Sequence, residues 1–447
     1  MRTGDFLSQE VAPSNNSISC IRVGVLMSHR WTIRVLDHFF DRYVGSFVCF
    51  IFSFLNLFRR TPKDRTIKKV LVIELFEMGA SLMAYPSLRY INKALPLAEI
   101  HVLCLDKLRE AWLIAGAVPS QNVFGIDNSS FWSLGWSILK QTRALSKQNI
   151  DLIIDFELFT RISAIISFLV RAKFKAGFYR YKFEGLYRGT FYDVKCAFNQ
   201  NMHIARNFLA LTKSALHLST KYYNYDGPIP VEEIVVPTYR SRLNVAKIMK
   251  QKIRDLFPEY TDQPIILVAP TVGYDLPSRD YPKDQYVEVI KTLLTLHKSS
   301  LVLLVGMSSH GPVAEYIHEH VNSDRCINFR HSTSTLTELM ELFLLSDLLI
   351  SNDSGNPHFA SMTPLKCLVL FGPETPYMYG PLGNCVCMYE FFHSSPSYMP
   401  YTHKNPATNE TDALKVIHPD TVVKMAETLL EGKGMYRTIN NKIPYLI

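Results

Sequence analysis

Stretches of apolar, β-branched residues alternate with stretches of helical periodicity along most of this chain, and this alternation constrains the fold more than any other feature. The first such stretch, KKVLVIEL at residues 68–75, precedes FEMGASLMAYPSLRYINKAL, in which apolar residues recur at helical spacing. The alternation continues with EIHVLCL, QNVFGID and DLIIDFEL, and after residue 262 with IILVAP, SLVLLVGM, RCINF, LLISND and LKCLVLFGP. Strands that alternate with helices predict parallel sheets covered by helices on both faces. We therefore expect an α/β protein of two doubly wound, Rossmann-like domains that face each other across a cleft.

The stretches that break this alternation divide the chain into segments. The pattern fades between about residues 180 and 255, where NYDGPIPVEEIVVP is rich in turn-forming residues, so we place the domain boundary near residue 240. We expect five segments: a disordered tail at 1–30, an apolar segment at 31–62, a first domain at 68–240, a second domain at 241–430 and a tail at 431–447. The space between the two domains is the default ligand site of this architecture.

Composition narrows the class of partner. The 447 residues include 48 Lys and Arg against 40 Asp and Glu, which gives a formal net charge of +8. This modest excess suits an anionic ligand or an anionic membrane surface, and no aromatic-basic motif favours nucleic acid. Among the eight cysteines only Cys385 and Cys387 lie close together, and a C-x-C pair alone predicts neither a zinc site nor a disulfide. We expect reduced thiols in a cytoplasmic protein, and no bound metal.

The segment at 31–62 has the character of a membrane anchor. Its apolar part, 44–58, has 15 residues, about 22 Å as a helix, whereas a spanning helix needs about 20 residues. Trp31 and Tyr43 stand near its edges, and arginines flank it on both sides: Arg30, Arg34, Arg42, Arg59 and Arg60. This pattern predicts a helix that lies at the interface of an anionic membrane. A helix buried against the protein's own core and a tilted transmembrane span are the alternatives.

One polar cluster follows the strand LLISND. Asp353, Ser354 and Gly355 emerge at its carboxyl end, and His358 lies in the first turn of the helix that follows. Because ligands bind outside the carboxyl ends of such strands, we expect Asp353 to hold sugar hydroxyls, and Ser354 with the Gly355 N–H to hold a diphosphate. We expect His358 to donate to a phosphate oxygen or to orient Asp353. The alternatives are a capped helix with a packed core histidine, and a Ser-His hydrolase, which would lack the usual G-x-S-x-G elbow.

A second cluster follows the strand IILVAP, and a third follows the first strand. Thr271 and Gly273 end the strand IILVAP, and Arg279 precedes the next helix, where a guanidinium suits a diphosphate. The alternative for Arg279 is an ordinary surface pair with a nearby aspartate, Asp280 or Asp284. The third cluster, FEMGAS at 76–81, places a glycine in the turn after the first strand.

Together the clusters resemble glycosyltransferase family 9, the heptosyltransferases of lipopolysaccharide assembly, which have the two-domain GT-B fold. NDSGNPHFASMTPLKCLVLFGPETP is similar to the family's Asp, small hydroxyl, Gly, two residues, His, Ala pattern, and LPSRDYP to its basic residue before Trp-Pro, with Tyr281 in place of Trp. The resemblance implies an acceptor-binding first domain and a donor-binding second domain. It implies that a nucleotide-sugar binds Asp353, Ser354, Gly355, His358, Arg279 and Thr271, and that an inverting, metal-independent transfer proceeds without a cofactor.

The chain departs from this family at one position. The family has an Asp after the glycine of the first loop, which acts as the general base, and this chain has Ala80 there. The resemblance therefore leaves the base open between Glu157 and Glu77, which rank equally, and Asp155. A carboxylate at the carboxyl end of a strand could have its pKa raised as a general base requires. The alternative for Glu157 is a salt bridge with Arg161 at the start of a helix.

Three functions are consistent with the sequence. The leading one is a glycosyltransferase at the cytoplasmic face of the inner membrane that uses a nucleotide-sugar donor and a glycolipid or lipid-linked acceptor. The second is a non-catalytic relative that binds the donor but has lost the base with Ala80. The third is a nucleotide-sugar epimerase, whose soluble substrates would leave the apolar segment unexplained. The sequence separates neither the sugar, nor the nucleotide base, nor the acceptor.

Overall fold

The structure is a computed structural model that describes residues 40–60, 62–158, 160–179, 187–218, 227–272, 279–306, 311–390 and 414–432. The predicted tail 1–30 lies outside these ranges, as do residues 31–39 of the apolar segment and nearly all of the predicted tail 431–447.

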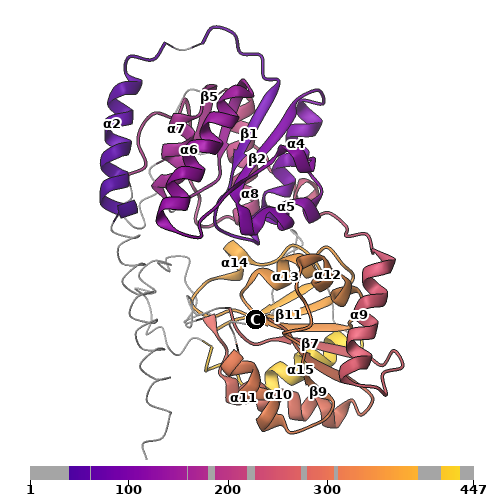
Figure 1. Ribbon diagram of the computed structural model, residues 1–447. Helices are drawn as coiled ribbons and strands as arrows, with labels where there is room; N and C mark the ends of the chain where they lie inside the picture. Colours follow the sequence, from indigo (N-terminus) through magenta and orange to yellow (C-terminus); the bar gives the residue numbers. More distant parts are fainter. Residues whose placement is uncertain are drawn as a thin grey trace, which may run out of the picture.

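Two parallel sheets of six strands confirm the predicted α/β class (Figure 1). The first sheet has the strand order β3-β2-β1-β4-β5-β6, and all its neighbours pair in parallel. Its strands are β1 (Lys69–Ile73), β2 (Glu99–Leu105), β3 (Val123–Ile126), β4 (Ile150–Asp155), β5 (Ala172–Phe178) and β6 (Val194–Cys196). Because both faces of the sheet are covered, the central strands consist of apolar, buried residues rather than an alternating pattern.

The second sheet repeats this topology. Its order is β12-β11-β10-β7-β8-β9, so the strand that opens each sheet, β1 or β7, lies in the middle. The strands are β7 (Ile265–Ala269), β8 (Leu301–Leu304), β9 (Cys326–Asn328), β10 (Leu348–Asn352), β11 (Lys366–Leu370) and β12 (Cys385–Met388). The order reverses between β7 and β10, which are paired in register from Leu348 with Ile266 to Ser351 with Ala269. Ligands of doubly wound sheets bind at the carboxyl ends of such a pair.

Helices cover both sheets, and we call each sheet with its helices a lobe. The first lobe contains α3 (Ala80–Met83), α4 (Tyr85–Ala94), η2 (Asp106–Leu108), α5 (Arg109–Ala115), η3 (Ser120–Asn122), α6 (Phe131–Lys147), α7 (Arg161–Leu169) and α8 (Ile204–Leu216). The second contains α9 (Leu243–Leu256), α10 (Lys283–Leu296), α11 (Gly311–Val321), α12 (Leu336–Leu344), α13 (Gly355–Ala360), α14 (Pro376–Tyr379) and α15 (Pro419–Leu430). Side-chain caps fix several starts: Ser130 accepts from Ser133 N before α6, and Thr160 from Ile162 N before α7.

The apolar segment forms the π-helical turn η1 (Phe40–Gly45) and the helix α2 (Ser46–Asn56), which lie against α7. Asp41 anchors them: its Oδ1 accepts from Thr160 Oγ1 and Arg161 N, both at 2.9 Å, and its Oδ2 accepts from Arg161 Nη1 at 3.0 Å. The Phe52 ring stacks on Phe168 with centroids 4.2 Å apart. Within the described ranges, no helix has both the length and the apolar character needed to cross a bilayer.

The connection between the lobes passes through η4 (Val231–Glu233) and reaches the second lobe just before α9. Tyr239 N donates to Met362 O at 2.9 Å, and Tyr239 Oη donates to Glu341 of α12 at 2.8 Å. Residue 239 is thus already attached to the second lobe, and the predicted boundary near residue 240 lies at this attachment.

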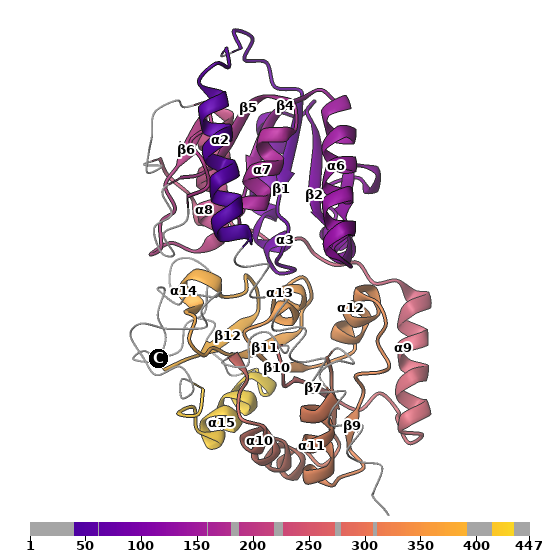
Figure 2. The ribbon, with the colours of Figure 1, turned by 60° about the vertical axis from the view of Figure 1, so that its left-hand side comes forward.

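The lobes meet through the carboxyl ends of their strands, so that α3 of the first lobe stands over α13 of the second (Figure 2). The Glu110 carboxylate crosses between the lobes and accepts from the N–H groups of Leu336 and Thr337 at the start of α12, both at 3.0 Å. His203, which caps α8, donates from Nε2 to Gly380 O at 2.8 Å. At Gly79 the lobes lie so close that a Cβ atom there would be 2.7 Å from the His358 ring.

Candidate active site

Arg279 is the centre of the polar cluster in the second lobe. Its Nη1 lies 3.2 Å from Asp353 Oδ2, and its Nη2 donates to Glu374 Oε1 at 3.1 Å. Both carboxylates are buried, and Thr271, two positions after the end of β7, is buried as well. The structure therefore brings Arg279 and Asp353 together at the carboxyl ends of β7 and β10, where the sequence places them. Gly273, which the sequence places after the same strand as Thr271, lies outside the described residues.

Glu374 is a residue of this cluster that the sequence analysis missed. It follows β11 by four positions, in FGPETP, so the rule that singled out Asp353 applies to it as well. Burial raises the pKa of Glu374 to about 8, against the lowering effect of Arg279, and the charges of Asp353 and Glu77 raise it further. Burial likewise raises the pKa of Asp353, and Arg279 lowers it. A single arginine thus faces carboxylates that resist being ionised together.

Ser354 and Gly355 begin α13, but Ser354 does not cap it. Its Oγ lies 3.2 Å from Ser351 Oγ, and no side-chain capping bond forms. Above Gly355, the Met78 sulfur would lie 3.7 Å from an added Cβ. The hydroxyl of Ser354 therefore makes no hydrogen bond to the start of α13, and the alternative in which Ser354 caps this helix is not what the structure shows.

His358 is a buried, neutral histidine that faces the other lobe. Burial, with His203 as a second cause, lowers its pKa to about 3. Its Nδ1 is buried and has no hydrogen-bond partner among the described residues. A neutral imidazole can offer one N–H, so it can donate to a phosphate oxygen but adds no charge.

The first lobe contributes a group of carboxylates where β1 and β4 end. Glu74 and Glu157 are buried, whereas the Glu77 side chain reaches solvent. Burial raises the pKa of Glu157 to about 8, opposed by the bond from Leu75 N and reinforced by Asp155 and Glu77. The pKa of Glu74 is also raised, by burial and then by Glu157 and Glu77.

Charged residues of the second lobe influence the pKa of Glu77, although Glu77 lies in the first lobe. Although its side chain reaches solvent, the protein crowds around it and raises its pKa, which Arg279 lowers and Asp353 raises. Glu77 lies in the same turn as Ala80, whose N–H bonds to Glu77 O at 3.2 Å and whose methyl group is buried at the start of α3. The carboxylate that this turn presents to the second lobe is therefore that of Glu77.

Glu157 holds the loop that carries Glu77. Its Oε1 accepts from Leu75 N at 2.6 Å and from Phe76 N at 3.1 Å. The expected alternative, a pair between Glu157 and Arg161, is not what the structure shows, since Arg161 pairs with Asp41 at 3.0 Å. The geometry gives Glu157 a positioning contact to the β1–α3 turn.

Asp155 is the centre of a buried network. Its Oδ2 accepts from Arg188 Nη2 at 2.7 Å, Tyr192 Oη at 2.5 Å and Ser163 Oγ at 3.1 Å, and its side chain is inaccessible. Arg188, which the sequence analysis did not single out, also donates to the backbone oxygens of Glu157 and Thr160. These bonds leave Asp155 in a structural position beneath the site.

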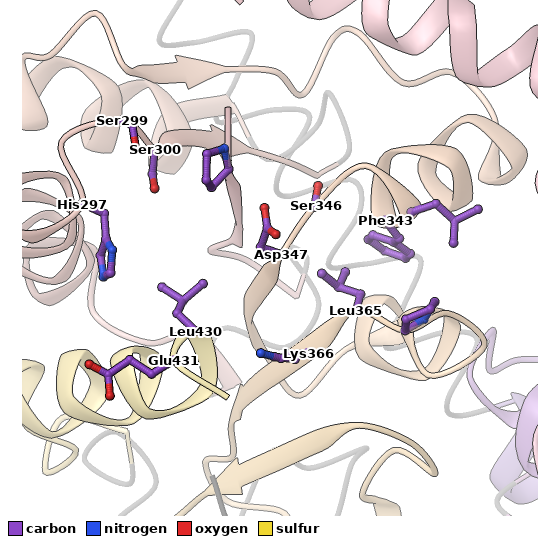
Figure 3. Close-up of a pocket in the computed structure, with 13 residues that line it drawn as sticks. His297, Ser299, Ser300, Phe343, Ser346, Asp347, Leu365, Lys366, Leu430 and Glu431 are labelled. Carbon is purple, nitrogen blue, oxygen red and sulfur yellow. The ribbon is translucent and has the colours of Figure 1, made fainter. Parts of the chain in front are cut away.

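A cavity of about 530 Å³ lies at the opposite edge of the second sheet (Figure 3). Its lining includes His297, Ser300, Asp347, Lys366 and Glu431, around the amino ends of β7, β10 and β11. Asp347 already accepts from Ile265 N at 2.9 Å, and Lys366 donates to Leu429 O at 2.6 Å. Its polar groups thus hold strand starts and α15, away from Arg279. Within the described ranges, no three His, Cys, Asp or Glu side chains are grouped as metal ligands.

Two Rossmann-like lobes that face each other through the carboxyl ends of their strands define a two-lobed α/β protein of the GT-B type. The chain belongs to glycosyltransferase family 9 (heptosyltransferase), whose family model matches residues 138–397. The matched residues include Glu157 and the whole cluster around Arg279. They begin after the β1–α3 turn, so Glu77 and Ala80 lie outside the match.

Known proteins share parts of the sequence and the fold. Lipooligosaccharide heptosyltransferase 2 of Haemophilus influenzae is 25% identical over 156 residues, which are 33% of this chain and 44% of that relative; the match thus spans less than half of its length. The structure of E. coli ADP-heptose LPS heptosyltransferase II matches with a TM-score of 0.63 and 18% identity, over 82% of this chain and 99% of that one. A glycosyltransferase family 9 structure from Veillonella parvula matches with a TM-score of 0.64 and 17% identity, over 84% and 100%. These structures establish the common fold.

Proposed function

We propose that this protein transfers a sugar from a nucleotide-sugar donor to a glycolipid or lipid-linked saccharide acceptor, in the assembly of lipopolysaccharide or a related envelope glycan. One observation carries the proposal: Arg279 is held between Asp353 and Glu374 at the strand ends of the second lobe, where the turn that contains Glu77 lies against α13. Membership of family 9 supports it. The E. coli relative is named as an ADP-heptose heptosyltransferase, so ADP-heptose is the first donor to test.

Donor binding would rest on Arg279 and its neighbours. A guanidinium makes charge-assisted bonds to phosphate oxygens, and here it is pre-oriented by two carboxylates. Asp353 would hold sugar hydroxyls. Because burial raises the pKa of Glu374 to about 8, the negative charge that Glu374 sets against an incoming diphosphate is reduced.

Transfer would be a single displacement with inversion. The acceptor hydroxyl attacks the anomeric carbon and gives its proton to a carboxylate; the bond to the diphosphate breaks, and the nucleoside diphosphate leaves with the electron pair, its charge stabilised by Arg279. Of the two carboxylates ranked equally from sequence, Glu77 fits the base better, because it reaches solvent whereas Glu157 is buried and bonded to Leu75 and Phe76. Glu157 then positions the turn.

Location at the membrane is part of this proposal. The predicted anchor at 31–62 presents large apolar side chains to solvent along α2, among them Phe47, Phe50 and Phe54. We propose that the protein binds peripherally at the cytoplasmic face of the inner membrane, where a lipid-linked acceptor would be found. The apolar residues and flanking arginines suit such an interface.

The test is a transfer assay with a panel of nucleotide-sugars, ADP-heptose included, and a lipid-linked acceptor, run beside donor-induced thermal shift. Wild type should give product with one donor class, and Arg279→Met should lose both donor binding and transfer. Arg254→Met, at an exposed arginine of α9, is the matched control and should keep both. If no donor stabilises the folded wild type, the proposal fails.

The second candidate function is donor binding without transfer. It is favoured by one observation, the buried alanine at the start of α3 where the family has its base. Donor-specific thermal shift without product, across acceptors of the family's type, would establish this function in place of the first.

A further inference from the structure

The helix α6 exposes large aromatic residues that the fold does not use. Trp132 is 84% exposed and Trp136 is 69% exposed, and Phe131 and Leu139 are exposed beside them. They occupy the first half of the helix, whose buried side faces β3 and α7. Single exposed apolar residues are ordinary, but contiguous groups of this kind mark an interaction surface.

This group continues into the apolar residues of two neighbouring helices. The Phe131 ring lies 6.1 Å from the ring of Phe40 in η1, and α7, between α2 and α6, leaves Ile162 and Ile165 partly exposed. Figures 1 and 2 show α2, α7 and α6 along one side of the first sheet. We call the outer side of these three helices the apolar face.

The charged residues within α2, α6 and α7 have one sign, and the acids beside these helices, Asp41 in η1 and Asp127 before α6, are bonded to Arg161 and Ser133. None of α2, α6 and α7 contains Asp or Glu, whereas α9, α10, α11 and α15 of the second lobe all do. On α6, Lys140, Arg143 and Lys147 are exposed and follow Trp132 and Trp136 at helical spacing. Exposed Trp and Phe beside Lys and Arg, on helices that contain no acid, match an anionic lipid surface.

The apolar face lies beside the candidate active site between the lobes. Both α6 and α7 follow strands, β3 and β4, and therefore begin at the carboxyl ends where the lobes meet. The aromatic half of α6 is thus the half nearer the second lobe, and the basic half is farther away. A membrane against this face would hold the lipid part of an acceptor beside the strand ends that carry Glu77 and Glu157.

We propose that α6 and α7 join α2 in one membrane-docking face that binds anionic lipid bilayers through Trp132, Trp136 and the basic residues of α6. The sequence pattern of residues 31–62 predicts nothing of α6, which begins about 70 residues later in the chain. The proposal rests on the proposed function for its purpose, the approach of a lipid-linked acceptor, but its geometry is independent of the donor site.

Vesicle flotation of the full chain tests it, with vesicles of phosphatidylethanolamine and phosphatidylglycerol and, for comparison, of phosphatidylcholine. Trp132→Ser/Trp136→Ser and Lys140→Glu/Arg143→Glu should each weaken flotation with the anionic vesicles by roughly tenfold or more. The matched control is Leu243→Ser/Leu256→Ser, at exposed leucines of α9, which should float like wild type. The two α6 variants remove different interactions, so misfolding of one leaves the other informative.

Two results would overturn the proposal. One is undiminished flotation of both α6 variants. The other is a concentration-dependent dimer of wild type that the tryptophan variant abolishes, with no flotation, which would make this face a contact between two copies of the chain. Transfer to a water-soluble saccharide fragment separates the proposal from the proposed function: a failed function gives no product with wild type, whereas a failed docking face leaves that activity and the flotation of all variants equal.

Discussion

Among the first-lobe carboxylates, Glu77 differs from Glu74, Asp155 and Glu157 because its side chain reaches solvent. We predict that Glu77→Gln lowers kcat by about 10²-fold or more, the usual contribution of a general base, while the donor dissociation constant stays unchanged. Glu157→Gln should keep most activity, since an amide oxygen still accepts from Leu75 N and Phe76 N, whereas Glu157→Ala should lose it. Steady-state kinetics and donor titration measure this.

The control for these substitutions is Glu319→Gln, at an exposed glutamate of α11. Full transfer activity of Glu77→Gln would exclude Glu77 as the base. Equal loss in Glu157→Gln and Glu157→Ala would instead assign the proton transfer to Glu157.

The raised pKa of Glu374 predicts how the stability of the folded protein depends on pH. Because its pKa is raised from 4.5 to about 8, the folded protein keeps this proton where the unfolded chain releases it. The stability that this proton contributes is present in full below pH 4.5 and is lost as the pH rises through about 8. Glu374→Gln, which cannot ionise, should therefore gain Tm relative to wild type progressively across this window. Glu319→Gln should give a flat difference, and a flat difference for Glu374→Gln would contradict the raised pKa.

At the scale of elements, the close contact between the β1–α3 turn and α13 is decisive. An added Cβ at Gly79 would lie 2.7 Å from the His358 ring, so Gly79→Ala should displace α3 from α13. We expect at least about a tenfold loss of kcat/KM, because moving α3 away from α13 also moves Glu77 away from its position relative to Arg279. Gly135→Ala is the control, since a Cβ there meets nothing within 4 Å and alanine favours the helix. Unchanged kcat/KM in Gly79→Ala would show that this contact is dispensable.

Most strands were predictable because buried parallel strands are continuous apolar runs, as β1 and β7 show. The strands β5, β6 and β12 were not among those expected, since their runs are short or interrupted by lysine and glycine. The positions of Asp353 and Arg279 were predictable from the same apolar runs, because each residue follows one of these strands in the sequence. What the sequence could not show is pairing between distant segments: Arg161 binds Asp41, 120 positions away, and Arg279 binds Glu374, 95 positions away. Such partners depend on how the layers pack. The exposed aromatic side of α6 was missed because its FWS and LGW stretches also fit an ordinary amphipathic helix.

At the scale of the whole molecule, Glu110 couples the lobes by accepting from the first N–H groups of α12. Glu110→Ala should lower the free energy of unfolding by about 1 kcal/mol, the usual worth of such a cap. Urea unfolding followed by circular dichroism measures this, with Glu319→Ala as the control for loss of an exposed acid. A stability equal to that of wild type would mean that the contact between α5 and α12 does not hold the lobes together.

Because both sheets have the same strand order, helix dipoles from both lobes contribute to the electrostatic potential between the lobes. Because α6, α7, α10 and α12 each follow a strand, all four begin where the two sheets face each other. The amino end of a helix carries roughly half a positive charge. Peptide dipoles from both lobes therefore point toward the same region, and they favour negative charge there in addition to any effect of basic side chains. This backbone potential offsets the mutual repulsion of the acidic side chains, and it would attract a diphosphate before any side chain touched it.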